Sequence, residues 1–186
     1  MTLAPWRPVL ARALHRNRAR AYCRYLQLAT LTPQGRPSNR TLVFRGFVND
    51  ALQMVTDSRS EKLQHIKICP WAEICWYFTV TREQFRITGE LTVIDTHHTG
   101  DIRQTAWQSQ SNKARQQFYW PHPGQARASD ALFESDDAVT DSPPDSFNVL
   151  LLYPERVDHL NLRGDPQNRY IYQRDDDGWK MQEVNP

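Results

Sequence analysis

The chain has 186 residues, of which 39% are apolar, 24% charged and 11% aromatic. That composition is typical of a globular domain and excludes a disordered, collagen-like or disulfide-knotted chain. No apolar run approaches the roughly 18 residues of a membrane-spanning helix, and we expect no secretory signal at the N-terminus. Three cysteines are few and odd in number, which indicates a reducing compartment. We therefore expect a single cytoplasmic domain over residues 1–186.

Positive charge is concentrated in the first 49 residues. This segment contains nine arginines and no acidic residue, whereas the remaining 137 residues carry 14 basic and 21 acidic side chains. Such a split suggests that the N-terminal third binds an anion, either nucleic acid or a phosphate-bearing small molecule. From composition alone, it is equally open that the acidic part of the same chain neutralises these arginines.

Local patterns in the first third predict one helix followed by strands. Apolar residues at helical spacing predict an N-terminal helix within residues 1–20. Segments rich in β-branched and aromatic residues then predict strands, separated by turns. These strands are expected at 22–31, 40–45 and 52–56. The short turns between them favour an antiparallel meander.

In the middle of the chain the spacing of apolar residues changes from that of a strand to that of a helix. Ser58 or Ser60 is a suitable N-cap for a helix that Pro70 would end. Two further strands are expected at 74–78 and 85–94, the second with a bulge at Gly89. The polar stretch 100–118 favours helix.

The last third returns to strands after a long loop. Residues 120–146 hold several prolines and aspartates without a period, which indicates a loop. Strands are expected at 147–153, 156–162, 169–174 and 179–184. Eight or nine strands with two interrupting helices predict a mainly β fold, a closed or partly closed antiparallel barrel. Too few helices alternate with strands for a doubly wound fold.

One group of residues has the chemistry of a phosphate site. Arg40 begins a predicted strand, Thr56 ends a later one, and Ser60 and Lys62 lie at the start of the following helix. A helix N-terminus favours an anion, hydroxyls add donors, and Arg and Lys add charge. The alternative is an ordinary capped helix with solvated charges.

Other candidates are weaker when taken alone. Gln84 at a strand start has a donor and an acceptor for a heterocycle, and Trp107 precedes a polar tract that could line a site. His65, Cys69 and Cys75 lack the close ligand pairs of zinc sites, so we expect no metal. The chain has no glycine-rich phosphate loop, so any nucleotide must be held by side chains and a helix end.

Five motifs in order resemble the pyridoxamine 5′-phosphate oxidase-like family of FMN-binding split barrels, from about Tyr25 to the C-terminus. The family patterns R-x-V-L-L-K, Y-T-N…S-R-K, R-Q-V-R-I-x-G, Q-S and D-R-x-x-Y-x-R…W…x-P correspond in turn to Arg40–Arg45, Val55–Asp57 with Ser60–Lys62, Gln84–Gly89, Gln110–Ser111 and Asn168–Pro186. They are spread over most of the chain.

The resemblance implies a homodimer with FMN at each subunit interface. It assigns the FMN phosphate and ribityl chain to the first two motifs and the flavin ring to Gln84, and implies further contacts from the partner subunit. The implied cofactor residues are Arg40, Thr41, Leu42, Val43, Val55, Thr56, Ser60, Glu61, Lys62 and Gln84, with Gln110, Ser111 and Arg169 from the partner.

The chain departs from the family pattern mainly on the substrate side. Arg45 replaces a lysine that contacts substrate phosphate, and Glu61 replaces a basic residue that contacts FMN phosphate. Asp165 and Gln167 stand where the family has a substrate-binding arginine and histidine, and Leu160 replaces a flavin-stacking tryptophan. An aspartate facing a substrate phosphate is repulsive. These changes argue against oxidation of pyridoxamine 5′-phosphate itself.

Three functions follow from these observations. The first is an FMN-dependent oxidoreductase that transfers a hydride between FMN and a small molecule, with Arg45 and Trp107 as candidate substrate contacts. The second is a flavin-binding carrier or sensor without turnover. The third, binding of nucleic acid by the arginines of residues 7–24, lacks any recognition motif, and we do not expect it.

Overall fold

The computed structural model describes residues 3–133 and 140–186, and within them it contains nine strands, four α-helices and three 3₁₀ helices. The helices are α1 (Trp6–Asn17), α2 (Lys62–Ile68), α3 (Ile102–Gln108), α4 (Asn112–Gln116), η1 (Ala21–Arg24), η2 (Gln117–Tyr119) and η3 (Asp130–Phe133). The strands are β1 (Tyr25–Leu31), β2 (Pro37–Val43), β3 (Gly46–Val48), β4 (Ala51–Asp57), β5 (Trp71–Phe78), β6 (Glu83–Ile94), β7 (Phe147–Asn161), β8 (Asn168–Asp175) and β9 (Gly178–Val184).

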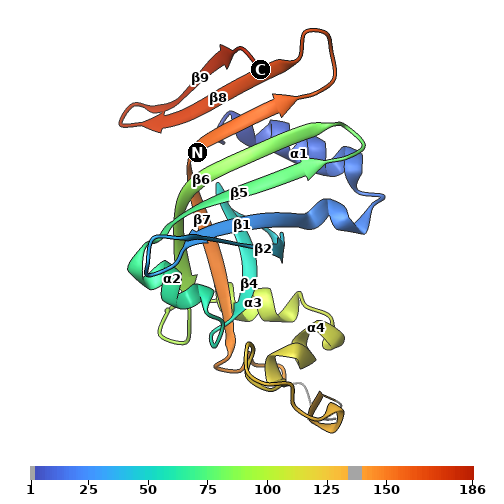
Figure 1. The fold of residues 1–186 in the computed structure, drawn as a ribbon, viewed down its shortest axis with the longest axis vertical. Coiled ribbons are helices and arrows are strands. Elements are labelled where there is room, and N and C mark those ends of the chain that lie inside the picture. The colour runs from blue at the N-terminus through green and yellow to red at the C-terminus, as the bar shows by residue number, and fades with distance from the viewer. Residues whose placement is uncertain (1–2, 134–139) are drawn as a thin grey trace.

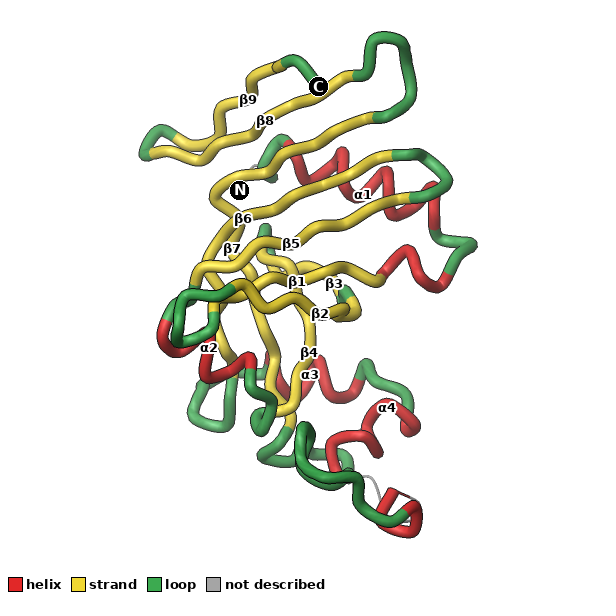
Figure 2. Tube along the Cα trace, viewed as in Figure 1, coloured by secondary structure: helices red, strands yellow, loops and turns green. Residues whose placement is uncertain are grey.

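All the strands belong to one antiparallel sheet, which curls into a half-barrel (Figure 1). The strand order is β2-β1-β5-β6-β7-β4-β3, and the β8–β9 hairpin extends from β7. Helices α3 and α4 lie at one end of the molecule and β8 and β9 at the other (Figure 2). The predicted mainly β, antiparallel split barrel is confirmed.

Strand β7 organises this sheet. It pairs with β6 over nearly its whole length, with β4 through its first part and with β8 through its last part. The prediction of two strands at 147–153 and 156–162 is therefore wrong. The register between β6 and β7 shifts between Thr88 and Gly89, so Pro154 is accommodated without ending the strand. The irregularity predicted at Gly89 is present, but the extra residue is Glu155 of β7 and not a residue of β6. A Cβ on Gly89 would lie 2.1 Å from the carbonyl oxygen of Tyr153, so only glycine fits there.

The predicted meander is also wrong. β1 and β2 pair as expected, but β4 pairs with β7 and with the short, unpredicted strand β3. Residues 40–45 do not form one strand either, because β2 ends at Val43 and β3 begins at Gly46. β4 is thereby brought to the opposite edge region of the curled sheet from β2.

Two hydrophobic clusters lie on opposite faces of β7. Its residues alternate between them, as expected for a strand buried on both sides. Leu150 and Leu152 join the cluster that α1 covers with Trp6. The neighbouring residues Val149 and Leu151 join the smaller cluster that packs against α3. The two clusters pack the two faces of β7 against different helices.

The helices lie where the sequence predicts them, but their caps and boundaries differ from the predictions. α1 lies within the predicted range 1–20. Glu61, not a serine, occupies the N-cap of α2, and it makes no side-chain cap. The helix-favouring stretch 100–118 divides into α3 and α4 because Ser111 caps a new helix. Part of the expected loop 120–146 forms η3, and residues 134–139 of it lie outside the described residues.

No helix among the described residues is both long enough and apolar enough to cross a membrane.

Candidate functional site

A cavity of about 350 Å³ lies between β2, β4, the start of α2 and the α4–η2 segment. We call it the β2–β4 cavity. Seven of the predicted cofactor residues line it: Thr41, Leu42, Val43, Val55, Thr56, Lys62 and Gln110. Gln110 was expected to reach the cofactor from the partner subunit, but it lines the cavity of its own chain, whereas Arg40, Ser60 and Glu61 are not part of the lining. Its volume is within the range of small-molecule sites. The structure thus brings together residues from three separate motifs of the sequence.

Lys62 is the main charged group of the β2–β4 cavity. Its Nζ donates to Oγ1 of Thr56 at 2.9 Å and to Oγ of Ser60, which leaves one donor for a ligand. Burial lowers the pKa of Lys62 to about 8, and the nearby charge of Arg40 adds to this effect while Asp57 opposes it. A bound anion would stabilise the charged form of Lys62 and so offset the effect of burial.

Arg40 lies beside Lys62 and is held by β1. It donates to the carbonyl oxygen of Leu28 at 3.2 Å, to Oγ of Ser38 at 2.7 Å and to Oγ1 of Thr30 at 2.7 Å. Thr30 Oγ1 lies 3.1 Å from Nδ1 of His65. Because arginine only donates, the Thr30 hydroxyl is free to donate its hydrogen to Nδ1, which places the proton of a neutral His65 on Nε2. Burial lowers the pKa of Arg40, and Glu61 opposes the effect.

Glu61 points largely away from the cavity. Its side chain is 79% exposed, and its Oε1 lies 3.6 Å from Nε2 of His65. The acidic replacement at this position therefore does not contact the place where Lys62 and Ser60 converge. Its charge still acts on Arg40 through space.

Gln110 has a polar atom that is buried without a partner. Its side-chain amide donates to the carbonyl oxygen of Ala106 at 2.9 Å, while its Oε1 is buried and accepts no hydrogen bond within the described chain. An unpaired buried acceptor is costly, so this atom is suited to a ligand donor. Ser111, the next residue, caps α4 instead.

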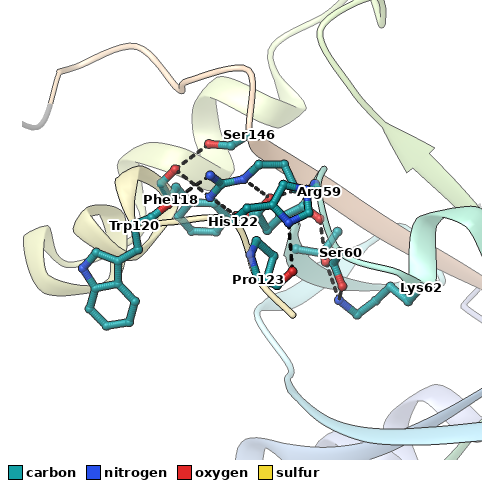
Figure 3. A network of polar contacts seen from close by, with 10 residues as sticks. Arg59, Ser60, Lys62, Phe118, Trp120, His122, Pro123 and Ser146 are labelled. Atoms are coloured by element: carbon teal, nitrogen blue, oxygen red, sulfur yellow. Dashed lines mark hydrogen bonds and ion pairs between the residues drawn. The ribbon is translucent and has the colours of Figure 1, made fainter. Parts of the chain in front are cut away.

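The sequence did not predict the role of Arg59, which joins Asp57 to the segment containing Phe118 and Trp120 (Figure 3). Its guanidinium forms a fork with Asp57, at 2.9 and 2.6 Å. It also donates to the carbonyl oxygens of Trp120 at 2.9 Å and of Phe118 at 3.4 Å, and Ser146 donates to the latter at 2.7 Å. The segment with Phe118 and Trp120, which lines the cavity, is thus anchored to β4. A basic residue beside an aspartate gives no local signal of such a contact.

Gln84 and Arg169 lie elsewhere on the sheet. Leu160 pairs with Gln84 on one side and with Arg169 on the other, so the three form a row across β6, β7 and β8. Arg169 donates to both oxygens of Asp158, at 3.0 and 2.8 Å. Burial alone would raise the pKa of Asp158, but hydrogen bonds from Arg169 and Arg86 outweigh it and lower the pKa. None of this row lines the β2–β4 cavity.

The two candidate substrate contacts differ in position. Arg45 lines the β2–β4 cavity. Trp107 is fully buried against Phe147 and Phe118, and its Nε1 donates to the carbonyl oxygen of Thr140 at 2.9 Å. A side chain with no exposed surface cannot touch a substrate in this conformation, so its expected substrate role is corrected to one of packing.

Two of the substitutions on the expected substrate side lie in the β7–β8 connection. Asp165 and Gln167 are exposed there, and neither lines the β2–β4 cavity of its own chain. Within the described residues, no group of three metal-ligating side chains gathers.

Residues 3–95 match the family model described as "Pyridoxamine 5′-phosphate oxidase, FMN-binding domain". Over 99% of its length the chain is 38% identical to pyridoxine/pyridoxamine 5′-phosphate oxidase 2 of Arabidopsis thaliana, 98% of which is covered. The chain belongs to the pyridoxamine 5′-phosphate oxidase-like family. Its cofactor is accordingly FMN, and the basic and hydroxyl side chains of the β2–β4 cavity fit the phosphate of such a group. Oε1 of Gln110, which has no partner among the described residues, fits a hydrogen-bond donor of the same cofactor rather than its phosphate.

Solved structures agree with this family. A pyridoxamine 5′-phosphate oxidase-related, FMN-binding protein from Nostoc punctiforme is 50% identical, with a TM-score of 0.95 and full coverage of both chains. PhzG from Burkholderia lata, solved with tetrahydrophenazine-1-carboxylic acid, shares the fold at 21% identity and a TM-score of 0.83, with 100% of this chain and 94% of that one covered.

Proposed function

We propose that the protein is an FMN-dependent oxidoreductase that transfers a hydride between a small-molecule substrate and FMN. The observation that carries this proposal is the β2–β4 cavity, where a lysine of lowered pKa and a buried, unpaired amide oxygen converge in a family whose cofactor is FMN. Bound FMN supplies the hydride-accepting ring.

In this proposal the chain binds and orients the cofactor. Lys62 and Arg40 neutralise the phosphate, with the hydroxyls of Thr56 and Ser60 positioned around Lys62. Gln110 accepts a hydrogen bond through Oε1. The apolar residues of β2 and β4 that line the cavity exclude water. Arg45 lies at the edge of the cavity, where a substrate approaches.

We also infer a homodimer. The row formed by Gln84, Leu160 and Arg169 lies outside its own chain's β2–β4 cavity, so these residues reach a flavin only across an interface. Large exposed side chains on one face of β1 and β5, among them Tyr25 and Tyr77, suit such an interface. Light scattering should give about twice the chain mass of 21.8 kDa, and a monomer would contradict the inference.

The substrate we propose differs from pyridoxamine 5′-phosphate. The Arabidopsis relative is named for that substrate and its pyridoxine analogue. In this chain, however, Asp165 and Gln167 replace the expected substrate-binding pair. The three cysteines are free, which agrees with the reducing cytoplasm that we infer as its location.

A flavin carrier or sensor without turnover is the second candidate. It is favoured by the cavity lining, because among the described lining residues Asp57 alone is acidic and its carboxylate is already held in a fork by Arg59. The presence of Leu160 instead of a flavin-stacking side chain also favours a carrier or sensor.

Anaerobic stopped-flow absorbance separates the two functions. The FMN-loaded protein is mixed with NADH, NADPH or pyridoxamine 5′-phosphate, with free FMN as the control. We expect the flavin absorbance to bleach with a nicotinamide faster than in free FMN, and no bleaching with pyridoxamine 5′-phosphate. Rates equal to those of free FMN with every reductant would contradict an oxidoreductase and favour the carrier.

A further inference from the structure

A second cavity, of about 460 Å³, adjoins the β2–β4 cavity. It lies between the end of α1, η1 and the connection from β2 to β3, and we call it the arginine cavity. His15 and four arginines line it: Arg18, Arg20, Arg24 and Arg45. Arg45 is the residue that the two linings share, so its side chain can contact a ligand in either cavity.

Backbone hydrogen bonds fix the frame of the arginine cavity. The amide of Phe44 donates to the carbonyl oxygen of Arg24 at 2.8 Å, which joins β2 to the end of η1. The buried indole of Trp76 donates to the carbonyl oxygen of Cys23 at 2.9 Å. The arginines therefore project from a backbone that the hydrophobic core holds in place.

The positive charge of this cavity is not neutralised within the described chain. Of the nine arginines in the first 49 residues, Arg7 alone has a carboxylate within 4.0 Å among the described residues, that of Asp50. This observation disfavours the idea that the acidic part of the same chain pairs with the basic segment.

Arg45 shows the cost of this arrangement most clearly. Its Nε is buried and has no hydrogen-bond partner in the described part of the chain. Burial lowers the pKa of Arg45, and the charge of Arg24 lowers it further. Like charges that are partly desolvated without a counter-ion destabilise a site, whereas an anion between them relieves both effects.

We propose that the arginine cavity binds the anionic group of the substrate, a carboxylate or a phosphate monoester, through Arg20, Arg24 and Arg45. The planar guanidinium donates two parallel hydrogen bonds to either anion, which suits both chemistries. The proposal rests on the proposed function, because the shared Arg45 then places the rest of the substrate beside the flavin. The cavity volume is sufficient for a small molecule.

The test uses the FMN-loaded protein, in which the cofactor phosphate site is filled. Inorganic phosphate and benzoate are titrated separately, and binding is followed by calorimetry and by the flavin spectrum. The double variant Arg20→Gln/Arg24→Gln should bind the preferred anion at least about tenfold more weakly. The double variant Arg16→Gln/Arg36→Gln removes the same charge outside both cavities and should stay within about twofold of wild type. The stronger of the two probes identifies the anion.

Equal weakening in both double variants would overturn the proposal, because the effect would be general electrostatic attraction. Unchanged binding in Arg20→Gln/Arg24→Gln would overturn it as well. If the protein retains no flavin, the proposed function fails separately. The same titrations in the Lys62→Met background, which disables the other phosphate site, then still test whether anion binding depends on Arg20 and Arg24.

Discussion

Lys62 couples the charge of the β2–β4 cavity to pH. Its pKa is about 8 in the folded chain without a ligand, against 10.5 for a free lysine side chain. Between these values the unfolded chain binds more protons than the folded one, so the free energy of unfolding rises with pH across that interval. A phosphate bound beside Lys62 stabilises the protonated lysine, so it raises the pKa that burial has lowered.

FMN affinity should therefore fall as the pH rises above about 8, by at most about tenfold per pH unit. The flavin phosphate is already dianionic there and contributes no slope of its own. Lys62→Met should weaken FMN binding about ten- to hundredfold and flatten the pH dependence. Flavin fluorescence titrations from about pH 7 to about pH 9.5 measure both effects. A Lys62→Met variant that keeps the wild-type slope would contradict this role.

Glu61 should weaken FMN binding only modestly. Its side chain is largely exposed and acts on Arg40 through solvent, so the Glu61→Gln variant should bind FMN about two- to threefold more tightly at low salt. Because exposed charges are screened by salt, the gain in affinity should vanish near 0.5 M salt, where the Debye length is roughly 4 Å. Glu90→Gln, on the exposed face of β6, is the matched control. A loss of affinity in Glu61→Gln would show that the carboxylate helps to hold the site.

Arg59 connects β4 to the segment that forms one wall of the β2–β4 cavity. Its fork on Asp57 and its bonds to the carbonyl oxygens of Phe118 and Trp120 lie in one network (Figure 3). Loss of the guanidinium would free this wall and leave Asp57 as an unpaired carboxylate beside the phosphate site. Both changes oppose FMN binding.

We expect Arg59→Gln to raise amide hydrogen exchange across residues 117–124 and to weaken FMN binding about tenfold. The double variant Asp57→Asn/Arg59→Gln separates the two causes, because it removes the repulsive carboxylate but leaves the wall free. Arg127→Gln, which breaks an exposed pair with Asp130, is the matched control. Unchanged exchange in residues 117–124 would contradict the anchoring role.

Sequence patterns located most strands but not how they pair. Local alternation and turn residues were sufficient for β5, β8 and β9. They also located β1, although residues 22–24 of the predicted strand belong to η1 instead. Pro154 falls in the gap between the two strands predicted at 147–153 and 156–162, and its place inside the single strand β7 depends on Gly89 in a distant strand. The pairing of β4 with β7 joins segments about a hundred residues apart in the chain, and no local pattern encodes it.

The site could be predicted where local chemistry sufficed. A lysine, two hydroxyls and an arginine near a helix start predict a phosphate site, and two of these residues, Thr56 and Lys62, line the β2–β4 cavity. Arg59 and the wall at Trp120 were missed, since their contacts span about sixty residues. The burial of Trp107 could not be predicted either. The polar tract that follows it indicates an exposed segment, whereas α3 places this side chain in the hydrophobic core.

Across the whole molecule, positive charge gathers where two cavities meet. The β2–β4 cavity and the arginine cavity share Arg45, and the basic residues of both come largely from the acid-free N-terminal third. The curled sheet brings this segment against β4, α2 and α4, while Gln84 and Arg169 remain outside. This layout is the basis of our proposal that one chain holds the FMN phosphate and the partner subunit reaches the flavin ring.

The most direct test is the visible absorbance spectrum of the purified protein after incubation with FMN and desalting. Wild type should retain about one flavin per chain, and the Arg40→Gln/Lys62→Met variant should lose it while keeping the wild-type circular dichroism spectrum. A colourless wild type, or a double variant that retains as much flavin as wild type, would contradict the assignment of FMN to the β2–β4 cavity.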